Sequence, residues 1–361
     1  MRLSELGVSQ RESWERCLAY HYYSYLAGEN GIGIVPVSYP YALLWGGIGH
    51  KGLAEWYSQL RVGTSPEDAV ASAKQVLVDE KNTLMDKWKE SEKDLDEKEL
   101  HVQKSFVLLD SFIDGYAKFY EDDKKFNIVA VEWEFNIPAE SFYPSEIIDS
   151  VTKLYGVELP NVRGTVDFVA EGRDGVWVVM DHKFNSMIET DLEPCMTFWK
   201  QPTIYARAVH LLWGARDVVY VHNQIRKPSG NLAPRMEKGR QESADEFLER
   251  IRDDYLLYPD YLDDLYPRGK KGYFYRASPL AISFDSKRFL AELACQDSEM
   301  VVSAGRLPER VGWKPPPPFL PRRHSACKKW GGKPCEYHML CTFGHNPVTV
   351  SHYVEREEPH T

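Results

Sequence analysis

Long apolar runs are absent from this chain of 361 residues. No stretch approaches the about 18 consecutive apolar residues that a membrane-spanning helix needs. The first residues, Met1-Arg2-Leu3-Ser4-Glu5, also lack the apolar stretch of a secretion signal. We therefore expect a soluble, cytoplasmic protein that has no membrane partner.

Two further shortages narrow the class of function. The sequence has no Gly-x-x-x-x-Gly-Lys-Ser/Thr phosphate loop, which excludes an ATP-driven motor of that type. Basic residues number 44 against 54 acidic ones, and the formal net charge is −10. An acidic average does not favour nucleic-acid binding, but it does not exclude it, because the field in a cleft depends on local charges and bound cations.

The order of the expected helices and strands predicts the fold class. Helical spacing of apolar residues dominates roughly the first sixty residues, and a charged helical stretch follows from about Ser65 to Asp123. Strands are expected at 128–135, 164–170, 176–183 and 218–222, a turn at 172–175, and helices at 202–212, 244–255 and 286–298. This order predicts an α/β sheet flanked by helices. A polar, irregular tail is expected from Asn346 to Thr361.

Two carboxylates and a lysine gather on the expected hairpin. Asp167 lies in the strand before the turn, and Asp181-His182-Lys183 ends the strand after it. Strand alternation places Asp181 and Lys183 on one face, and hairpin pairing can bring Asp167 beside them. Such carboxylates suit Mg²⁺ or Mn²⁺, with the carbonyl of His182 as a further ligand. Taken alone, however, an Asp-x-Lys triplet is more often a surface ion pair at a strand end.

Three further residues extend the candidate site. His50 follows Gly46-Gly47-Ile48-Gly49 and shares a helical face with Leu53 and Tyr57. It is either a core histidine or a third metal ligand. Gln201 and Tyr205 are four residues apart, so they lie on one side of the expected helix, where ordinary packing is the alternative role.

The cysteines have a pattern of their own. Cys327, Cys335 and Cys341 fall within fifteen residues among turn-forming residues, which is typical of soft-metal ligands. Four thiolates are usual for an iron–sulfur cluster or a zinc ion, and Cys17 is the best fourth ligand. Spacing alone does not separate iron–sulfur from zinc. Cys195 and Cys295 are expected to be small buried residues.

Basic residues mixed with aromatic ones indicate surfaces for a nucleic-acid strand, by charge attraction and base stacking. One such segment holds Arg268, Lys270, Lys271, Tyr273 and Tyr275. A second positive strip, near the cysteines, includes Arg322 and Arg323. The alternative for the first segment is a solvated loop beside a packed aromatic strand.

Taken together, these motifs resemble the RecB-like PD-(D/E)XK nucleases, and most closely their iron–sulfur branch. That branch includes AddB-type nuclease domains, CRISPR spacer-acquisition nucleases and phage exonucleases. The resemblance runs through Cys17, Gly49-His50, Gly164-x-x-Asp167, Asp181-x-Lys183, Gln201-x-x-x-Tyr205 and the terminal cysteines. It implies a single nuclease domain over 1–361 with a restriction-endonuclease-like core, a helical insertion at about 65–123 and a cluster-binding loop at 327–341.

The resemblance also implies roles for individual residues. His50, Asp167 and Asp181 would hold Mg²⁺ or Mn²⁺, Lys183 would be the catalytic lysine, and Gln201 and Tyr205 would lie beside the DNA. Cys17, Cys327, Cys335 and Cys341 would hold a [4Fe–4S] cluster, and Glu132 would be an auxiliary acid.

The expected activity is exonucleolytic cutting of DNA ends or single strands, with a helicase, recombinase or CRISPR integrase as a possible partner. Two other classes stay open: a non-catalytic, metal-stapled DNA-binding subunit, and an enzyme whose cysteines do redox chemistry.

Overall fold

The structure of the chain is a computed structural model. It describes residues 4–28, 33–36, 41–89, 95–172, 174–185, 188–189, 192–196, 199–226, 236–237, 240–257, 274–306, 335–343 and 345–356. Within these ranges, no helix is both long and apolar enough to cross a bilayer.

A mixed, seven-stranded sheet forms the centre of the molecule. Its long strands are β3 (Asn127–Ile137), β4 (Asn161–Glu171), β5 (Trp177–Asn185) and β6 (Val218–Arg226). β4 pairs antiparallel with β3 on one edge and with β5 on the other, and β5 then pairs parallel with β6. The short strands β1 (Glu5–Gly7), β9 (Phe274–Arg276) and β10 (Leu280–Ala281) complete the sheet.

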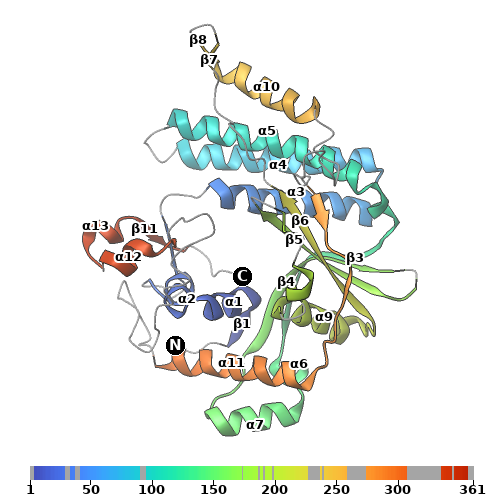
Figure 1. Cartoon of the computed structure of the whole chain (residues 1–361), viewed down its shortest axis with the longest axis vertical. Coiled ribbons are helices and arrows are strands. Elements are labelled where there is room, and N and C mark those ends of the chain that lie inside the picture. Colours follow the sequence, from blue (N-terminus) through green and yellow to red (C-terminus); the bar gives the residue numbers. More distant parts are fainter. Residues whose placement is uncertain are drawn as a thin grey trace.

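Long helices cover one face of the sheet (Figure 1). They are α3 (Tyr41–Arg61), α4 (Pro66–Lys89) and α5 (Leu95–Phe119), followed by a 3₁₀ turn, η1 (Glu121–Lys125), and joined by α10 (Ala244–Leu257). Their apolar faces share one core with strand residues such as Phe168, Met180 and Phe184. The charged stretch from Ser65 to Asp123 thus forms two helices that pack on α3.

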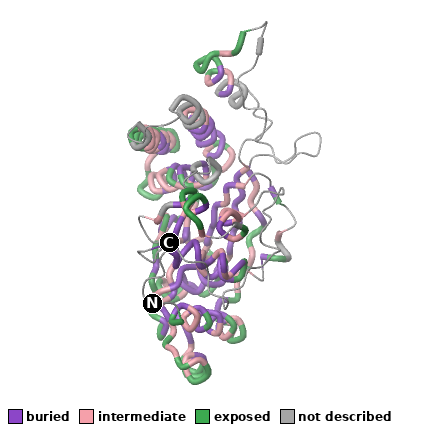
Figure 2. Tube along the Cα trace, turned by 90° about the vertical axis from the view of Figure 1, so that its left-hand side faces the viewer, coloured by how far each residue is buried: buried purple, intermediate pink, exposed green. Residues whose placement is uncertain are grey.

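A second helical layer covers the opposite face. It contains α6 (Ala139–Phe142), α7 (Ser145–Tyr155), α8 (Glu193–Met196), α9 (Lys200–Trp213) and α11 (Lys287–Gly305). Val166, Val169 and Val179 point into this second core, whereas their strand neighbours point into the first. Buried residues are accordingly concentrated in the middle of the chain trace, and the outer helices expose their far sides (Figure 2).

The two ends of the chain pack together. α1 (Val8–Arg16), α2 (Leu18–Tyr25) and β2 (Ile34–Pro36) lie near α12 (His338–Phe343), α13 (Pro347–Val350) and β11 (Tyr353–Glu355). Tyr22, Tyr23, Tyr337 and Tyr353 belong to one apolar cluster, and β11 pairs antiparallel with β2. A further hairpin joins β7 (Met236–Glu237) to β8 (Arg240–Gln241).

The predicted α/β class, with a sheet flanked by helices, is confirmed. The hairpin forms between β4 and β5, and the helix expected at 202–212 is α9. One expectation was wrong. The irregular tail contains α13, capped by Asn346, and a strand that pairs with β2, because Tyr353 is buried against the N-terminal aromatic residues.

Candidate active site

The site lies where β5 separates from β4. The two strands pair from Glu171 and Trp177 down to Phe168 and Met180. The next pair in this register would be Asp167 with Asp181, but the ladder ends there, and the first residues of β4 pair instead with β1. Asp167 Oδ2 accepts a hydrogen bond of 2.6 Å from the backbone nitrogen of His182. Both carboxylates therefore lie at a fork between strands, where the β4–β5 ladder has ended.

Three potential metal ligands meet at this fork. His50 of α3, Glu132 of β3 and Asp167 of β4 offer ligand atoms that all lie within 4.8 Å of one another. His50 Nδ1 is 3.7 Å from Glu132 Oε1 and 3.7 Å from Asp167 Oδ2. Two carboxylates and an imidazole form a donor set that suits Mn²⁺ or Mg²⁺. The residues at the fork therefore fit a divalent cation.

Glu132 enters this group through an unusual backbone conformation. Its neighbours pair with Phe168 and Val166, which places Glu132 opposite Asp167. Glu132 has φ +45°, and no other non-glycine residue in the described chain has a positive φ. This conformation costs about 1–3 kcal/mol and persists only where the surroundings hold it. Sequence reasoning assigned Glu132 only an auxiliary role, because strand alternation does not reveal a left-handed residue.

Asp181 has a different environment, although it adjoins the three ligands. It is buried, and its carboxylate accepts hydrogen bonds from Gln201 Nε2 at 3.0 Å and from the Tyr220 hydroxyl at 3.2 Å. Lys183 Nζ lies 2.9 Å from Asp181 Oδ2. Burial disfavours the ammonium, but Asp181 and Asp167 outweigh it and hold the pKa of Lys183 above its usual value. Lys183 is therefore a cation fixed at the edge of the fork.

The charges at the fork are strongly coupled. Burial, followed by the nearby carboxylate of Asp181, raises the pKa of Asp167 to about 7. Burial alone would lower the pKa of His50, but the hydrogen bond to Glu132 and the charge of Asp167 raise it overall. Acidic groups gathered in this way are typical of a site that a cation neutralises.

The helix after β5 adds the two residues expected from the sequence. α9 begins at Lys200, so Gln201 stands in its first turn, and Gln201 Nε2 also donates to the Tyr205 hydroxyl at 3.0 Å. Gly164 makes room for this arrangement, because a Cβ there would lie 2.7 Å from the Phe135 ring and 3.3 Å from the Tyr205 ring. Gln201 and Tyr205 thus face the same carboxylate, Asp181.

α3 reaches the fork because it passes very close to β5. A Cβ on Gly49 would lie 2.4 Å from the ring of Phe184, whereas Gly46 and Gly47 have open space at that position. The ring of His50 then lies 5.3 Å from that of Phe184. Gly49 is therefore the glycine that the approach of α3 to the sheet requires.

The structure brings together the six residues expected at the catalytic site: His50, Asp167, Asp181, Lys183, Gln201 and Tyr205. The roles of Asp181 and of the His182 carbonyl as metal ligands stay predictions. Sequence reasoning missed Tyr220, since an aromatic residue within a strand looks like ordinary core. It also missed Glu12 of α1, which lies near Lys183 and Asp181 although about 170 residues separate them in the chain.

The cysteines expected to hold a cluster are only partly described. Cys17 is buried between α1 and α2. Cys335 and Cys341 pack against the apolar cluster of side chains that joins the two chain ends. Both thiols lie near the Tyr353 hydroxyl. Cys327 lies outside the described residues. Within the described ranges, no group of three metal-ligating atoms includes a thiol, and ligation by these four cysteines stays a prediction.

The two remaining cysteines differ from expectation. Cys195 is exposed and Cys295 is only partly buried, so the prediction that both are buried was wrong. Cys195 stands on the outer side of the short helix α8, where the next residue, Met196, fills the second core instead.

Most of the expected nucleic-acid contacts also lie outside the described residues: Arg268, Lys270, Lys271, Tyr273, Arg322 and Arg323. Tyr275 is half-buried in β9 against the second core. Its role in DNA binding stays a prediction, as do the positive strips.

Comparison with known protein families agrees with the observed fold. Residues 5–269 match the family model of the PD-(D/E)XK nuclease superfamily. Because the match covers most of the chain, this protein belongs to that superfamily. A search of curated proteins found no match.

Proposed function

We propose that this protein is a DNA nuclease that hydrolyses phosphodiester bonds with Mn²⁺ or Mg²⁺. The observation that carries the proposal is the fork itself, where His50, Glu132 and Asp167 converge beside the buried pair of Asp181 and Lys183. Membership of the nuclease superfamily supports the same chemistry.

The residues at the fork divide the work of hydrolysis. His50, Glu132 and Asp167 would hold the cation, which when bound lowers the pKa of water and neutralises phosphate oxygens. Lys183, held by Asp181, is placed to donate hydrogen bonds to the attacking water or to the phosphate. Gln201 and Tyr220 keep the Asp181 carboxylate in position. Because imidazole is a softer ligand than carboxylate, we expect Mn²⁺ to support cutting better than Mg²⁺.

We also propose that the protein acts as an exonuclease on DNA ends or single strands. We propose in addition that the four cysteines expected to be ligands bind an iron–sulfur cluster or a zinc ion, which would hold the two chain ends together. The proposal of metal binding is supported by the packing of Cys335 and Cys341 against the apolar cluster of aromatic residues that both chain ends share. Anaerobic purification followed by metal analysis tests it. A preparation with neither iron nor zinc would contradict it.

The decisive experiment is digestion of end-labelled single- and double-stranded DNA with Mn²⁺. Wild-type protein should cut, whereas Asp167→Asn and Asp181→Asn should not. Asp149→Asn, an exposed change on α7, is the matched control and should cut normally. Circular single strands separate the modes of action, since an exonuclease leaves them intact.

DNA binding without any cutting by the wild-type protein would contradict the proposal. It would favour a non-catalytic DNA-binding subunit.

A further inference from the structure

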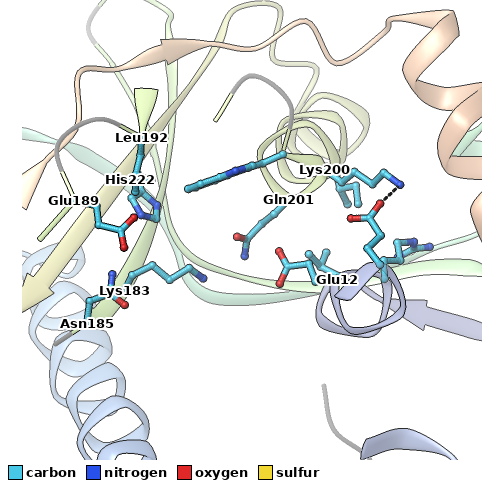
Figure 3. Close-up of a pocket in the computed structure, with 13 residues that line it drawn as sticks. Glu12, Lys183, Asn185, Glu189, Leu192, Lys200, Gln201 and His222 are labelled. Atoms are coloured by element: carbon cyan, nitrogen blue, oxygen red, sulfur yellow. Dashed lines mark ion pairs between the residues drawn. The ribbon is translucent and has the colours of Figure 1, made fainter. Parts of the chain in front are cut away.

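A cavity of about 390 Å³ opens next to the fork. Figure 3 shows Lys183, Gln201 and Glu12 pointing into it from β5, α9 and α1. Lys183 and Gln201 both line the cavity and also contact Asp181, so the cavity lies one side chain away from the candidate catalytic carboxylate. This volume suits one small organic ligand.

Among its described lining residues, the cavity has no excess of positive charge that would select a phosphate. The three cations each lie against a carboxylate: Arg11 is 2.7 Å from Asp297, Lys183 is 2.9 Å from Asp181, and Lys200 is 2.5 Å from Glu15. Glu12 and Glu189 add further negative charge to the lining. The balance favours an uncharged ligand.

The walls of the cavity suit a flat, aromatic one. Trp199 lines it just before α9 and meets the ring of His222 edge-on, with centroids 5.2 Å apart. Val8, Leu192 and Ile204 supply apolar contacts, and Asn185, Gln201 and Glu12 supply hydrogen-bonding groups. Aromatic and apolar walls with a few polar groups are typical of a nucleobase pocket.

We propose that this cavity binds one unpaired nucleobase of the substrate, stacked on Trp199, next to the phosphate that is cut. The inference rests on the proposed nuclease function and adds to it the form of the substrate. A paired base can enter such a pocket only after it leaves the duplex stack. The protein would therefore act where a base is already unpaired, at a frayed end or in a single strand.

The test uses single-stranded oligonucleotides that carry 2-aminopurine at the 5′ end, at the 3′ end or internally. Ca²⁺ replaces Mn²⁺ so that the strand stays intact. Stacking on Trp199 should quench one probe position more strongly than the others. Trp199→Leu should remove that difference and weaken binding by about tenfold, while Trp199→Phe should retain most of both, because it keeps an aromatic ring.

A second measurement uses only the wild-type protein, so it does not depend on how a variant folds. Free deoxynucleosides, which carry no phosphate, should relieve the quenching, and inorganic phosphate at the same concentration should not. Relief by phosphate alone, or equal quenching at every probe position, would overturn the inference.

The two proposals can fail separately. Cutting with Mn²⁺ but without any Trp199-dependent quenching would leave the nuclease function standing and refute the base pocket. Trp199-dependent quenching without any cutting would refute the nuclease function and leave the base pocket standing.

Discussion

The hydroxyl of Tyr57 donates a hydrogen bond of 2.7 Å to Asp123 Oδ2, and both residues are buried beneath the fork. Tyr57 lies two helical turns after His50 on α3. Arg276 of β9 binds the same carboxylate, with Nη1 2.7 Å from Asp123 Oδ1. The Tyr57 hydroxyl also lies 2.9 Å from the Tyr116 hydroxyl, which accepts a hydrogen bond from Asn223 Nδ2, and Asn223 in turn bonds the ring of His182. This network ties the helix that carries His50 to the strands that carry the carboxylates.

Asp123→Asn should therefore destabilise the protein strongly. Arg276 would keep its charge while losing its anionic partner, and an uncompensated charge of this kind costs about 3–5 kcal/mol when it is buried. Because Arg276 is partly exposed, we expect Asp123→Asn to lower the free energy of unfolding by about 2–3 kcal/mol, as measured by urea unfolding. Asp122→Asn is the matched control, since Asp122 is an exposed neighbour paired with Lys125 and should change the free energy of unfolding by less than about 0.5 kcal/mol. Equal effects of the two changes would contradict the role of the network.

Gly49 provides a test of the position of α3. Gly49→Ala places a methyl group against the Phe184 ring, so either the ring or α3 must shift, and because Phe184 is itself buried we expect α3 to move outward and take His50 with it. Cutting should fall by about a hundredfold, since a displacement of about 1 Å has an effect of that size. In Gly47→Ala the added methyl group contacts no other atom. This change should leave cutting unchanged and stabilise the helix by about 0.5–1 kcal/mol.

A second-site change makes this prediction sharper. Phe184→Leu should restore part of the activity of Gly49→Ala, because it removes the ring that the methyl group meets. If the double variant cuts no better than Gly49→Ala, the close approach of α3 and β5 is not the cause.

Glu132 is expected to act through the cation. Glu132→Gln removes one anionic ligand, so the Mn²⁺ concentration that gives half-maximal cutting should rise about tenfold or more. High Mn²⁺ should recover much of the rate. Glu134→Gln, an exposed change two residues further along β3, is the control and should behave like wild type. An unchanged Mn²⁺ requirement in Glu132→Gln would remove Glu132 from the ligand set.

Much of the fork could be predicted from the sequence because its parts are local. Asp167, the turn and Asp181-x-Lys183 form one hairpin, whose register follows from strand alternation and a short turn. Gln201 and Tyr205 follow from helical spacing in the next element. In each case the regular repeat of side-chain positions along a strand or a helix is enough to predict which residues lie together.

Other parts depend on contacts between distant segments, which no local pattern encodes. Glu5–Gly7 pairs with the first residues of β4, more than 150 positions later in the chain, and Glu12 reaches the cavity only through this pairing. Arg276 comes directly after Tyr275, the last residue of the segment expected to face DNA, yet it binds Asp123 and Tyr57 inside the protein. The strained backbone of Glu132 is likewise set by its surroundings and not by its neighbours in sequence.

His21 provides a prediction on stability against pH. Its ring is buried in α2, stacks on Tyr25 and lies 2.8 Å from the Ser13 hydroxyl. Burial lowers its pKa from 6.5 to about 4 in the folded protein. The unfolded chain therefore binds a proton at higher pH than the folded protein does. The stability from neutral His21 is present above pH 6.5 and is lost as the pH falls from about 6.5 to about 4.

This loss should reach about 2 kcal/mol at pH 5, since one pKa unit corresponds to about 1.4 kcal/mol. The measurement is urea unfolding of wild type and His21→Gln at pH 7 and pH 5. The other buried histidines contribute equally to both proteins, so the variant should lose about 2 kcal/mol less than wild type between the two conditions. His352→Gln, an exposed change, should keep the full dependence of wild type. Identical slopes for His21→Gln and wild type would mean that burial of this imidazole does not govern stability in acid.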